Sequence, residues 1–402
     1  MRSARVSVFL AVRSVVRGNY GITALTTLMM LLIYVSLLFL PSLIQGAVNR
    51  VNGLLVDTVT SDVVITAAGS ASSIDDLDTY LSQIRKTQGV QGATAVYHVG
   101  TQISYGSESG SYSVDAIDPS TYSQVFSTPG NIYSGHYLSE SSTEQIFVGI
   151  GVAGAGQTSI RGYRASLQTV QSNDQVQVGL VNGHTDAFSV VGIYDNQFPL
   201  SDNNAYISMS EANQLIPASQ DQATAIYVKT DPGADVNTVV HRLQGVRGGM
   251  KFETSADLGS VVQDQTASFS LISDILKVIS LLMAAITIFI ITYIDLVNKR
   301  RQIGIQRAIG IRGGSIIASY VLKAWSYALI GVGAGYLLFA YPITAAVQHH
   351  PFQFPNGPVT LATTWNEMSG DIVILVIVAT IAALIPSVRS VQIRILDAIW
   401  GS

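Results

Sequence analysis

A glycine-rich stretch after a predicted strand is the first part of the chain whose residues could bind a nucleotide. Gly149, Gly151 and Gly154 spell G-x-G-x-x-G, and the overlapping run 151–158 is one residue away from a phosphate-binding loop. Such a loop needs a lysine after its second glycine to reach the β- and γ-phosphates, and that position holds Gln157. A dinucleotide site also needs an acidic residue about 20 positions further on in a βαβ unit, and none is evident. We interpret the stretch as a flexible glycine-rich connection.

Two adjacent histidines, His349 and His350, are the next candidates for chemistry. Zinc ligands near one another on a chain are usually separated by intervening residues, and this chain has no cysteine to complete such a site. We interpret both histidines as solvated loop side chains. No motif brings serine, histidine and aspartate together, and thiolate chemistry is absent without cysteine. The sequence therefore predicts no catalytic residue, no metal site and no cofactor site in this chain.

A short charged segment, residues 298–315, has a pattern that an ordinary loop would not have. Its sequence is NKRRQIGIQRAIGIRGGS, so isoleucines recur between the arginines. This spacing predicts an amphipathic helix with an apolar side available to a partner.

Four apolar segments lie around this helix and predict membrane spans at residues 21–45, 271–297, 316–347 and 371–390. The first segment has no charged residue between Gly18 and Asn49. This stretch is long enough to span a membrane, because about 20 apolar residues cross the hydrocarbon of a bilayer. Its apolar core is longer than that of a signal peptide and no clean cleavage site follows, so the span is predicted to be uncleaved. Buried core helices of a soluble protein are the alternative interpretation, weakest for the first segment.

The basic residues are distributed unequally about these spans, and such residues collect on the cytoplasmic side of membrane proteins. Four arginines precede the first span, and five basic residues lie within 299–312. Arg389 is at the end of the fourth span and Arg394 follows it, whereas 348–370 has no lysine or arginine. Both termini, including the tail 391–402, are therefore predicted to be cytoplasmic in the cell membrane. Residues 46–268 and the loop 348–370 are predicted to lie outside.

The first 20 residues carry arginines within one sector of a helical wheel. This predicts an amphipathic helix that lies on the cytoplasmic leaflet and contacts membrane lipids, with a plain positive flank as the alternative. Near the spans, Asp274 and Lys277 are one helical turn apart and are expected to pair or to meet headgroups. Lys323 is expected to extend to the cytoplasmic surface.

Residues 46–268 have a different composition, rich in serine, threonine, glutamine and glycine. Alternating runs predict strands at 97–104, 145–150, 175–181, 187–194 and 225–229. Helices are expected over 74–86, with Asp75 and Asp76 in its first turn, and from Asp235 as N-cap. Both helices run into a Gln-Gly-Val-x-Gly turn, where glycine is expected to supply a positive φ. The predicted fold class is an α+β membrane protein, with four transmembrane helices and a large mixed α/β domain between helices 1 and 2.

The composition agrees with a membrane protein. Hydrophobic residues make up 48% of the 402 residues and charged residues only 12%, against about a quarter in ordinary soluble domains, and the mean hydropathy is +0.37. The net charge of −4 averages a basic cytoplasmic side and an acidic middle domain. No basic patch is interleaved with aromatic residues, so nucleic acid is not an expected partner.

The charged segment resembles a signature of the MacB/FtsX-type permeases of ABC transporters, R-R-x-E-I-G-[IL]-x-R-A-[IL]-G. The order of one span, a large outer domain and three further spans is also similar to that family. The resemblance identifies the ATPase-coupling residues as Arg301, Gln302, Ile303, Gly304, Ile305, Arg307, Ala308, Ile309 and Gly310. Gln302 departs from the glutamate usual in that family, so the resemblance implies the loss of a charge available to pair with the nucleotide-binding subunit.

Other parts of the chain support the resemblance less specifically. Residues 9–19 look like the family's amphipathic lead-in, and Lys323 stands where many relatives carry glutamate. Pro386, Arg389 and 396–399 are similar to its C-terminal pattern, with Leu396 in place of a second proline. The small-residue pattern of the third span, where glycine lets helices approach closely, is matched by Gly331, Gly333 and Gly335.

The resemblance implies a permease subunit without an ATP site of its own. Two copies would form a homodimer and work with two copies of a cytoplasmic ABC ATPase, which would bind ATP and Mg, with room for a periplasmic or extracellular adaptor. ATP hydrolysis would move the outer domain, either to export a hydrophobic compound, peptide or lipoprotein or to transmit movement to outer enzymes.

Two other classes of function are alternatives. A membrane sensor with an extracytoplasmic ligand-binding domain would need a cytoplasmic output domain, and the inner segments are short. A channel or secondary transporter usually has more spans, inverted repeats or interrupted helices.

Overall fold

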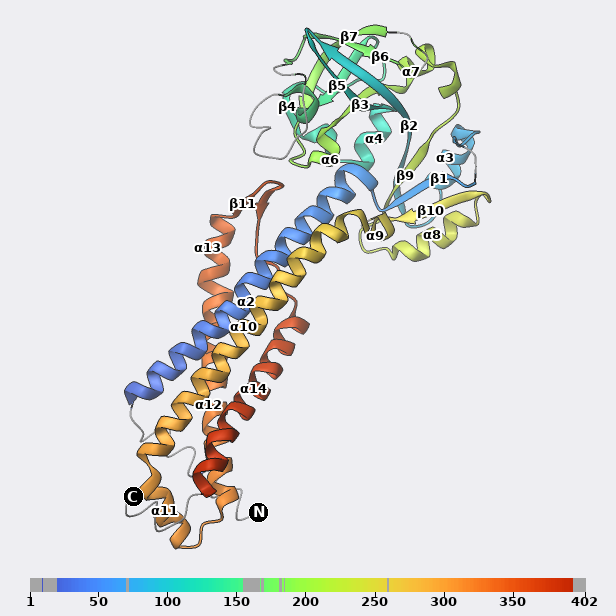
Figure 1. The fold of residues 1–402 in the computed structure, drawn as a ribbon. Helices are drawn as coiled ribbons and strands as arrows, with labels where there is room; N and C mark the ends of the chain where they lie inside the picture. Colours follow the sequence, from blue (N-terminus) through green and yellow to red (C-terminus); the bar gives the residue numbers. More distant parts are fainter. Residues whose placement is uncertain are drawn as a thin grey trace. The chain divides into compact units, whose positions relative to one another are not determined.

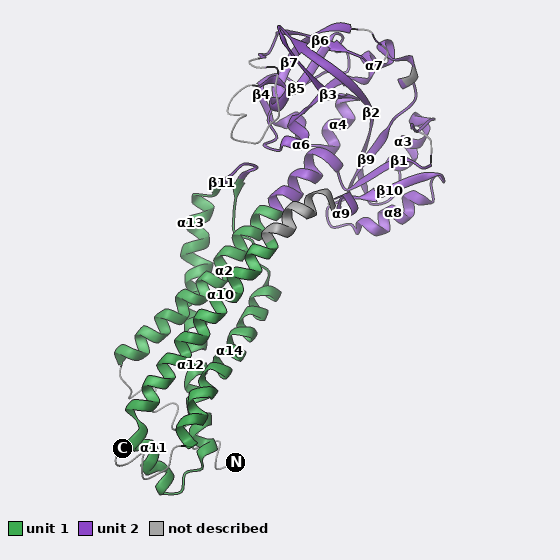
Figure 2. Ribbon diagram, viewed as in Figure 1, with its two compact units in different colours: residues 1–48, 266–352, 358–402 green, residues 49–265, 353–357 purple. Residues whose placement is uncertain are grey.

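A computed structural model of the chain describes residues 20–69, 72–154, 170–180, 185–258 and 260–392, together with residues 9, 167 and 183. It divides into two compact units (Figure 2). We call residues 1–48, 266–352 and 358–402 the helical domain, and residues 49–265 with 353–357 the β-rich domain. The predictions for residues 1–8 and 10–19, for Gln157 and for 393–402 lie outside the described residues.

The helical domain is built on four helices that are long and apolar enough to cross a membrane (Figure 1). They are α2 (Tyr20–Leu55), α10 (Ser260–Asn298), α12 (Gly313–Leu338) and α14 (Trp365–Gln392). The third continues through a π-helical turn, η5 (Phe339–Ile343), into α13 (Thr344–His349). After it come the two short strands of a hairpin, β11 (Phe352–Phe354) and β12 (Gly357–Val359). Each of the four predicted spans falls within one of these long helical segments.

Glycines in α12 allow α2 to approach closely. A Cβ added at Gly331 would overlap the Cβ of Met30, and one added at Gly335 would lie 3.0 Å from the Tyr34 ring. At Gly333, by contrast, no described heavy atom lies within 4 Å of an added Cβ. The sequence therefore predicted the close approach correctly at two of the three glycines.

The β-rich domain contains a ten-stranded sheet in the order β10-β1-β9-β2-β3-β8-β5-β7-β4, with β6 pairing β2 and β7. Pairs β3–β8 and β5–β7 are parallel and the other pairs are antiparallel. The strands are β1 (Val63–Ala67), β2 (Val90–Tyr105), β3 (Glu108–Ile117), β4 (Ile132–Gly135), β5 (Gln145–Gly149), β6 (Gln175–Gly179), β7 (Thr185–Tyr194), β8 (Asn204–Ser208), β9 (Ala225–Thr230) and β10 (Met250–Thr254). This arrangement confirms the mixed α/β class.

Short helices connect these strands. They are η1 (Val56–Thr60), α3 (Leu77–Arg85), α4 (Pro119–Val125), η2 (Thr128–Gly130), α5 (Ile150–Ala153), α6 (Pro199–Asp202), α7 (Met209–Leu215), η4 (Pro217–Ser219), α8 (Val236–Gln244) and α9 (Ser255–Leu258). One buried cluster packs α3 and α8 on β1 and β9, through residues such as Ile84, Leu243 and Ile65. A second cluster fills the other end of the sheet around Ile103, Val148 and Val190. Strand β2 contributes to both clusters because it is long enough to run through both ends of the sheet.

All five predicted strands are confirmed, although β1, β3, β4, β8 and β10 were not predicted. Asp235 is confirmed as an N-cap, since its side chain accepts a hydrogen bond from the Thr238 backbone N–H. Helix α3 begins only at Leu77, and its first N–H groups donate to the Asp221 carboxylate instead of using Asp75 or Asp76.

The expectation about the turns that follow these two helices was half right. Gly89 has φ +94°, as predicted, but Gly245 has φ −74° and the positive angle falls later, at Gly249 (+77°). The two turns share a sequence pattern without sharing a backbone path.

Candidate ATPase-coupling site

The coupling helix predicted from the charged segment is α11 (Arg300–Ala308). It is shorter than the segment 298–315 because Gly310 adopts a left-handed conformation, with φ +94°. The Gly310 and Ile311 N–H groups donate to the carbonyls of Arg307 and Gln306, which is the Schellman pattern that ends a helix. The glycine at position 310 is therefore explained by the end of α11, after which the chain turns directly into α12.

The apolar residues of α11 are divided between two sides of the helix. Ile303 is 4% exposed and packs with Leu296 of α10 and with Ile316 and Tyr320 of α12. Residues four apart lie on one face of a helix, and Ile305 and Ile309 are such a pair, 47% and 73% exposed. The helix is therefore anchored to the bundle by one side and presents apolar surface on the other.

The remaining predicted coupling residues are distributed in the same way. Gly304 is buried beside Ile303, and Arg307 is half-buried. Arg301, Gln302, Ala308 and Gly310 are exposed. The exposed set includes arginine, one of the residue types enriched among the strongest contacts in protein interfaces.

An acidic residue, Asp295, lies near the corner between α10 and α11. The Asp295 carboxylate contacts Lys299 Nζ at 3.1 Å and Lys323 Nζ, from α12, at 2.8 Å. Lys323 was expected to extend to the cytoplasmic surface, but its side chain is only 10% exposed. That expectation was wrong because a partner on the neighbouring helix holds the ammonium group inside the bundle.

A second ion pair joins α10 to α14. Lys277 Nζ lies 3.5 Å from the Asp371 carboxylate, whose side chain is 10% exposed. The expected pair of Asp274 with Lys277 is not among the ion pairs of the described residues. Asp371 is more distant in sequence but is the carboxylate that tertiary packing brings to this lysine.

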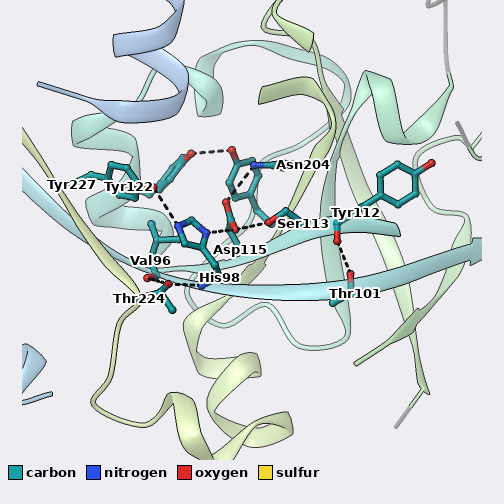
Figure 3. Close-up of polar contacts among 11 residues, drawn as sticks. Val96, His98, Thr101, Tyr112, Ser113, Asp115, Tyr122, Asn204, Thr224 and Tyr227 are labelled. Carbon is teal, nitrogen blue, oxygen red and sulfur yellow. Dashed lines mark hydrogen bonds and ion pairs between the residues drawn. The ribbon is translucent and has the colours of Figure 1, made fainter. Parts of the chain in front are cut away.

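The β-rich domain holds a polar cluster that the sequence analysis did not identify (Figure 3). His98 of β2 and Asp115 of β3 are directly opposite in the antiparallel register, with Nδ1 2.6 Å from Oδ1. Ser113 and Asn204 also donate hydrogen bonds to the Asp115 carboxylate, which is 7% exposed. The other ring nitrogen of His98 lies 3.3 Å from the Tyr227 hydroxyl of β9.

A sequence signal for this pair exists. Gly106 and Ser107 form a two-residue turn between β2 and β3, a combination that favours a tight hairpin. Once Tyr105 is paired with Glu108, counting back along both strands places His98 opposite Asp115. Burial alone would lower the pKa of His98, but the hydrogen bond and the charge of Asp115 outweigh burial and the pKa is raised.

The two motifs that the sequence analysis set aside have structural explanations. Gly149 precedes the one-turn helix α5, where an added Cβ would overlap the Asp202 backbone, and Gly154 ends the turn with φ +72°. This part of the glycine run is an ordered buried turn, so the expectation of a flexible connection was wrong for it. His349 ends α13 and His350 follows it, and no group of three metal-ligating side chains occurs among the described residues.

Comparison with known families now identifies the chain. The profile of the MacB-like periplasmic core domain matches residues 23–246, and that of the FtsX-like permease C-terminal region matches residues 275–395. An uncharacterized ABC transporter permease of Methanocaldococcus jannaschii is 20% identical over 80% of this chain and 78% of its own length.

Two other relatives match only in part. The macrolide export ATP-binding/permease protein MacB of Hahella chejuensis is 29% identical over 38% of this chain, and a probable syringafactin export ATP-binding/permease protein of Pseudomonas syringae is 24% identical over 45%. The chain spans only 24% and 30% of these two proteins.

Among solved structures, the periplasmic region of MacB from Actinobacillus actinomycetemcomitans covers 52% of this chain and 95% of its own at 12% identity, with a TM-score of 0.37. The two family profiles together cover most of the chain, including α11 and the four long helices. The chain belongs to the MacB/FtsX-like family of ABC transporter permeases.

Proposed function

We propose that this chain couples ATP hydrolysis by a separate cytoplasmic ATPase to movement of its β-rich domain. The observation that carries the proposal is the two-sided packing of α11. Its inner side is fixed to α10 and α12 through Ile303, and its outer side presents Ile305 and Ile309 to solvent. A helix fixed in this way can receive a force on one side and pass it to the bundle on the other.

The exposed side of α11 is suited to a protein partner. Covering a solvent-exposed isoleucine contributes roughly 1.5–3 kcal/mol, and Ile309, at the C-cap of α11, is 73% exposed. Arg301 adds the side-chain type that most often anchors interfaces. The relevant partner is an ABC ATPase in two copies, which would bind ATP and Mg, with a second copy of this permease completing the assembly.

The proposed orientation places α11 and both termini in the cytoplasm and the β-rich domain outside the cell membrane. Basic residues are concentrated at 299–312, whereas 348–370 has none, in agreement with the rule for cytoplasmic segments. Under this orientation α11 is on the side where ATP is available.

Two continuous helices supply the route for transmission. Helix α2 has 36 residues and α10 has 39, so each is more than about 50 Å long at 1.5 Å per residue. Both begin in one domain and end in the other. A displacement of the α10–α11 corner would therefore pass along α10 to residues 260–265, the last part of the main segment of the β-rich domain. The relatives named as macrolide and syringafactin exporters favour export as the use of this movement. The proposed cargo is a hydrophobic compound, peptide or lipoprotein, and transmission of movement to an outer enzyme is the alternative use.

The test is purification of the tagged full chain from its own membranes in mild detergent, with mass spectrometry and an ATPase assay. The parent protein should carry a stoichiometric ABC ATPase, and Ile309→Asp should lose it while remaining monodisperse. Ile132→Asp is the matched control, because Ile132 is also exposed (42%) but lies on β4 in the other domain.

Ile303→Asp is not a useful variant for this test, since burying a carboxylate at that site would disturb folding itself. A parent preparation that holds no ATPase under several gentle conditions would overturn the proposal and favour a membrane sensor. Retention of the ATPase by Ile309→Asp would remove α11 from the interface.

A further inference from the structure

The corner between α10 and α11 contains one carboxylate shared by two ammonium groups from two different elements. Lys299 follows Asp295 by one helical turn and caps the start of α11, whereas Lys323 is 28 residues away on α12. The side chains of Asp295 and Lys323 are 17% and 10% exposed. From this geometry we propose that Asp295 is a positioning residue that fixes α10, α11 and α12 together, so that a push on α11 is transmitted to the long helix.

The surroundings of the carboxylate strengthen this connection. The buried apolar cluster of Leu296, Ile303, Ile316 and Tyr320 packs the same three helices together, and Leu296 is the residue next to Asp295. Lys323 Nζ is also 5.6 Å from the centre of the Tyr327 ring, a cation–π distance that holds the ammonium in place. Charge attraction in such a partly dry corner is stronger than on an open surface.

In the cluster of Asp295, Lys299 and Lys323, removing the negative charge should have a different effect from removing one positive charge. One carboxylate and two ammonium groups carry a net charge of +1. Without the Asp295 charge, Lys299 and Lys323 lose the carboxylate that they share, and the repulsion between the two ammonium groups opens the corner. Without the Lys323 charge, Asp295 keeps Lys299 but loses its direct link to α12. Asp295→Asn should therefore have a larger effect than Lys323→Met.

The inference rests on the proposed function and deepens it by naming the residue through which the movement passes. It separates two properties, binding of the ATPase to the exposed side of α11 and transmission of its movement to α10. Asp295 lies on the buried side of the corner, so its substitution should affect the second property and leave the first.

The absence of cysteine from the chain makes a direct test possible. Val278→Cys places the only thiol on α10, at a 55% exposed position about 25 Å along the helix from Asp295 at 1.5 Å per residue. A spin label there is measured in the full chain purified with its ATPase, before and after addition of ATP, Mg and vanadate. The parent should show a nucleotide-dependent change in the spectrum.

Asp295→Asn should retain the ATPase and lose the change, and Asp295→Glu, which keeps the charge, should restore it. Asp274→Asn is the matched control, because Asp274 is an exposed aspartate on the same helix with no ion pair among the described residues. A merely structural role would alter stability without removing the nucleotide response of an intact complex.

Each result decides the question. If Asp295→Asn keeps both the ATPase and the spectral change, the inference is wrong. If Asp295→Asn does not fold or loses the ATPase, Lys323→Met takes its place: a weakened response with the ATPase retained supports the inference, and a parental response overturns it. Absence of an ATPase from the parent overturns the proposed function first, which is a different outcome.

Discussion

Adding one methyl group at Gly331 of α12 tests how closely α12 packs against α2, and the same change at Gly333 is the control. At Gly331 an added Cβ overlaps the Met30 Cβ and lies 3.1 Å from the Leu31 backbone nitrogen, so neither α2 nor α12 can relax by rotating a side chain alone. At Gly333 no described heavy atom lies within 4 Å of an added Cβ. Gly331→Ala and Gly333→Ala therefore change the same helix by the same atoms in opposite environments.

The magnitude follows from the difference between the two variants. Alanine is favoured over glycine in a helix by up to ~1 kcal/mol, and this gain is common to both sites, so it cancels. What remains is the cost of overpacking, typically ~1–3 kcal/mol. Gly335→Ala, whose Cβ would lie 3.0 Å from the Tyr34 ring and 3.2 Å from the Leu31 carbonyl oxygen, should fall between the two.

The assay is unfolding of the purified full chain in detergent by denaturant, with the three variants compared in the same micelle. We expect the order of stability Gly333→Ala, Gly335→Ala, Gly331→Ala, from most to least stable. Equal stability of Gly331→Ala and Gly333→Ala would show that α2 does not lie against α12 at this position, and the close packing of these helices would have to be abandoned.

Three further predictions concern single contacts. Ile303→Ala should lower the free energy of unfolding by about 2–5 kcal/mol, as for other buried aliphatic residues, whereas Ile309→Ala should change it by less than about 0.5 kcal/mol, as at open surface sites; denaturant unfolding of the full chain compares them. Lys277→Met should cost about 3 kcal/mol by leaving Asp371 without its counter-ion, and Lys277→Met/Asp371→Leu should recover most of the loss in the same assay. The stability that the protein gains from the His98–Asp115 pair should be fully present below about pH 6.5, the ordinary histidine pKa. It should be lost as the pH rises through the raised pKa of His98 in the folded protein. Hydrogen exchange of β2 and β3, corrected for intrinsic rates, should show this loss in the parent and no pH dependence of stability in Asp115→Asn.

Helix α11 illustrates what local sequence can predict. Arginines and isoleucines in a repeating pattern between two apolar segments indicated an amphipathic helix, and α11 is found there. The pattern did not indicate that Ile303 and Ile309 lie on opposite sides. The burial of Ile303 depends on its packing against Ile316 and Tyr320 of α12. The exposure of Ile309 depends on the end of the helix, which the positive φ of Gly310 sets.

The ion pairs show the opposite case. Asp295 and Lys323 are 28 residues apart, and Lys277 and Asp371 are 94 apart, so no periodicity within one helix could pair them. The nearer candidates along the chain misled the prediction for Lys277, because it favoured a residue one turn away. His98 and Asp115 are an intermediate case, since a two-residue hairpin turn fixes their register once the turn is recognised.

The composition of α10 differs from that of the other three long helices in a way that suits the proposed transmission of movement. Sharp helix kinks arise chiefly at proline and glycine. Helix α2 contains Pro41 and Gly46, α14 contains Gly370 and Pro386, and α12 is interrupted by glycines, whereas α10 has neither residue along its 39 positions. An unkinked helix transmits a displacement only if its junction with the moving element is fixed, because movement within the junction would absorb the displacement. The shared carboxylate of Asp295 lies at the end of α10 next to α11, so under the proposed function a helix without proline or glycine meets an ion-paired corner where the movement would enter it.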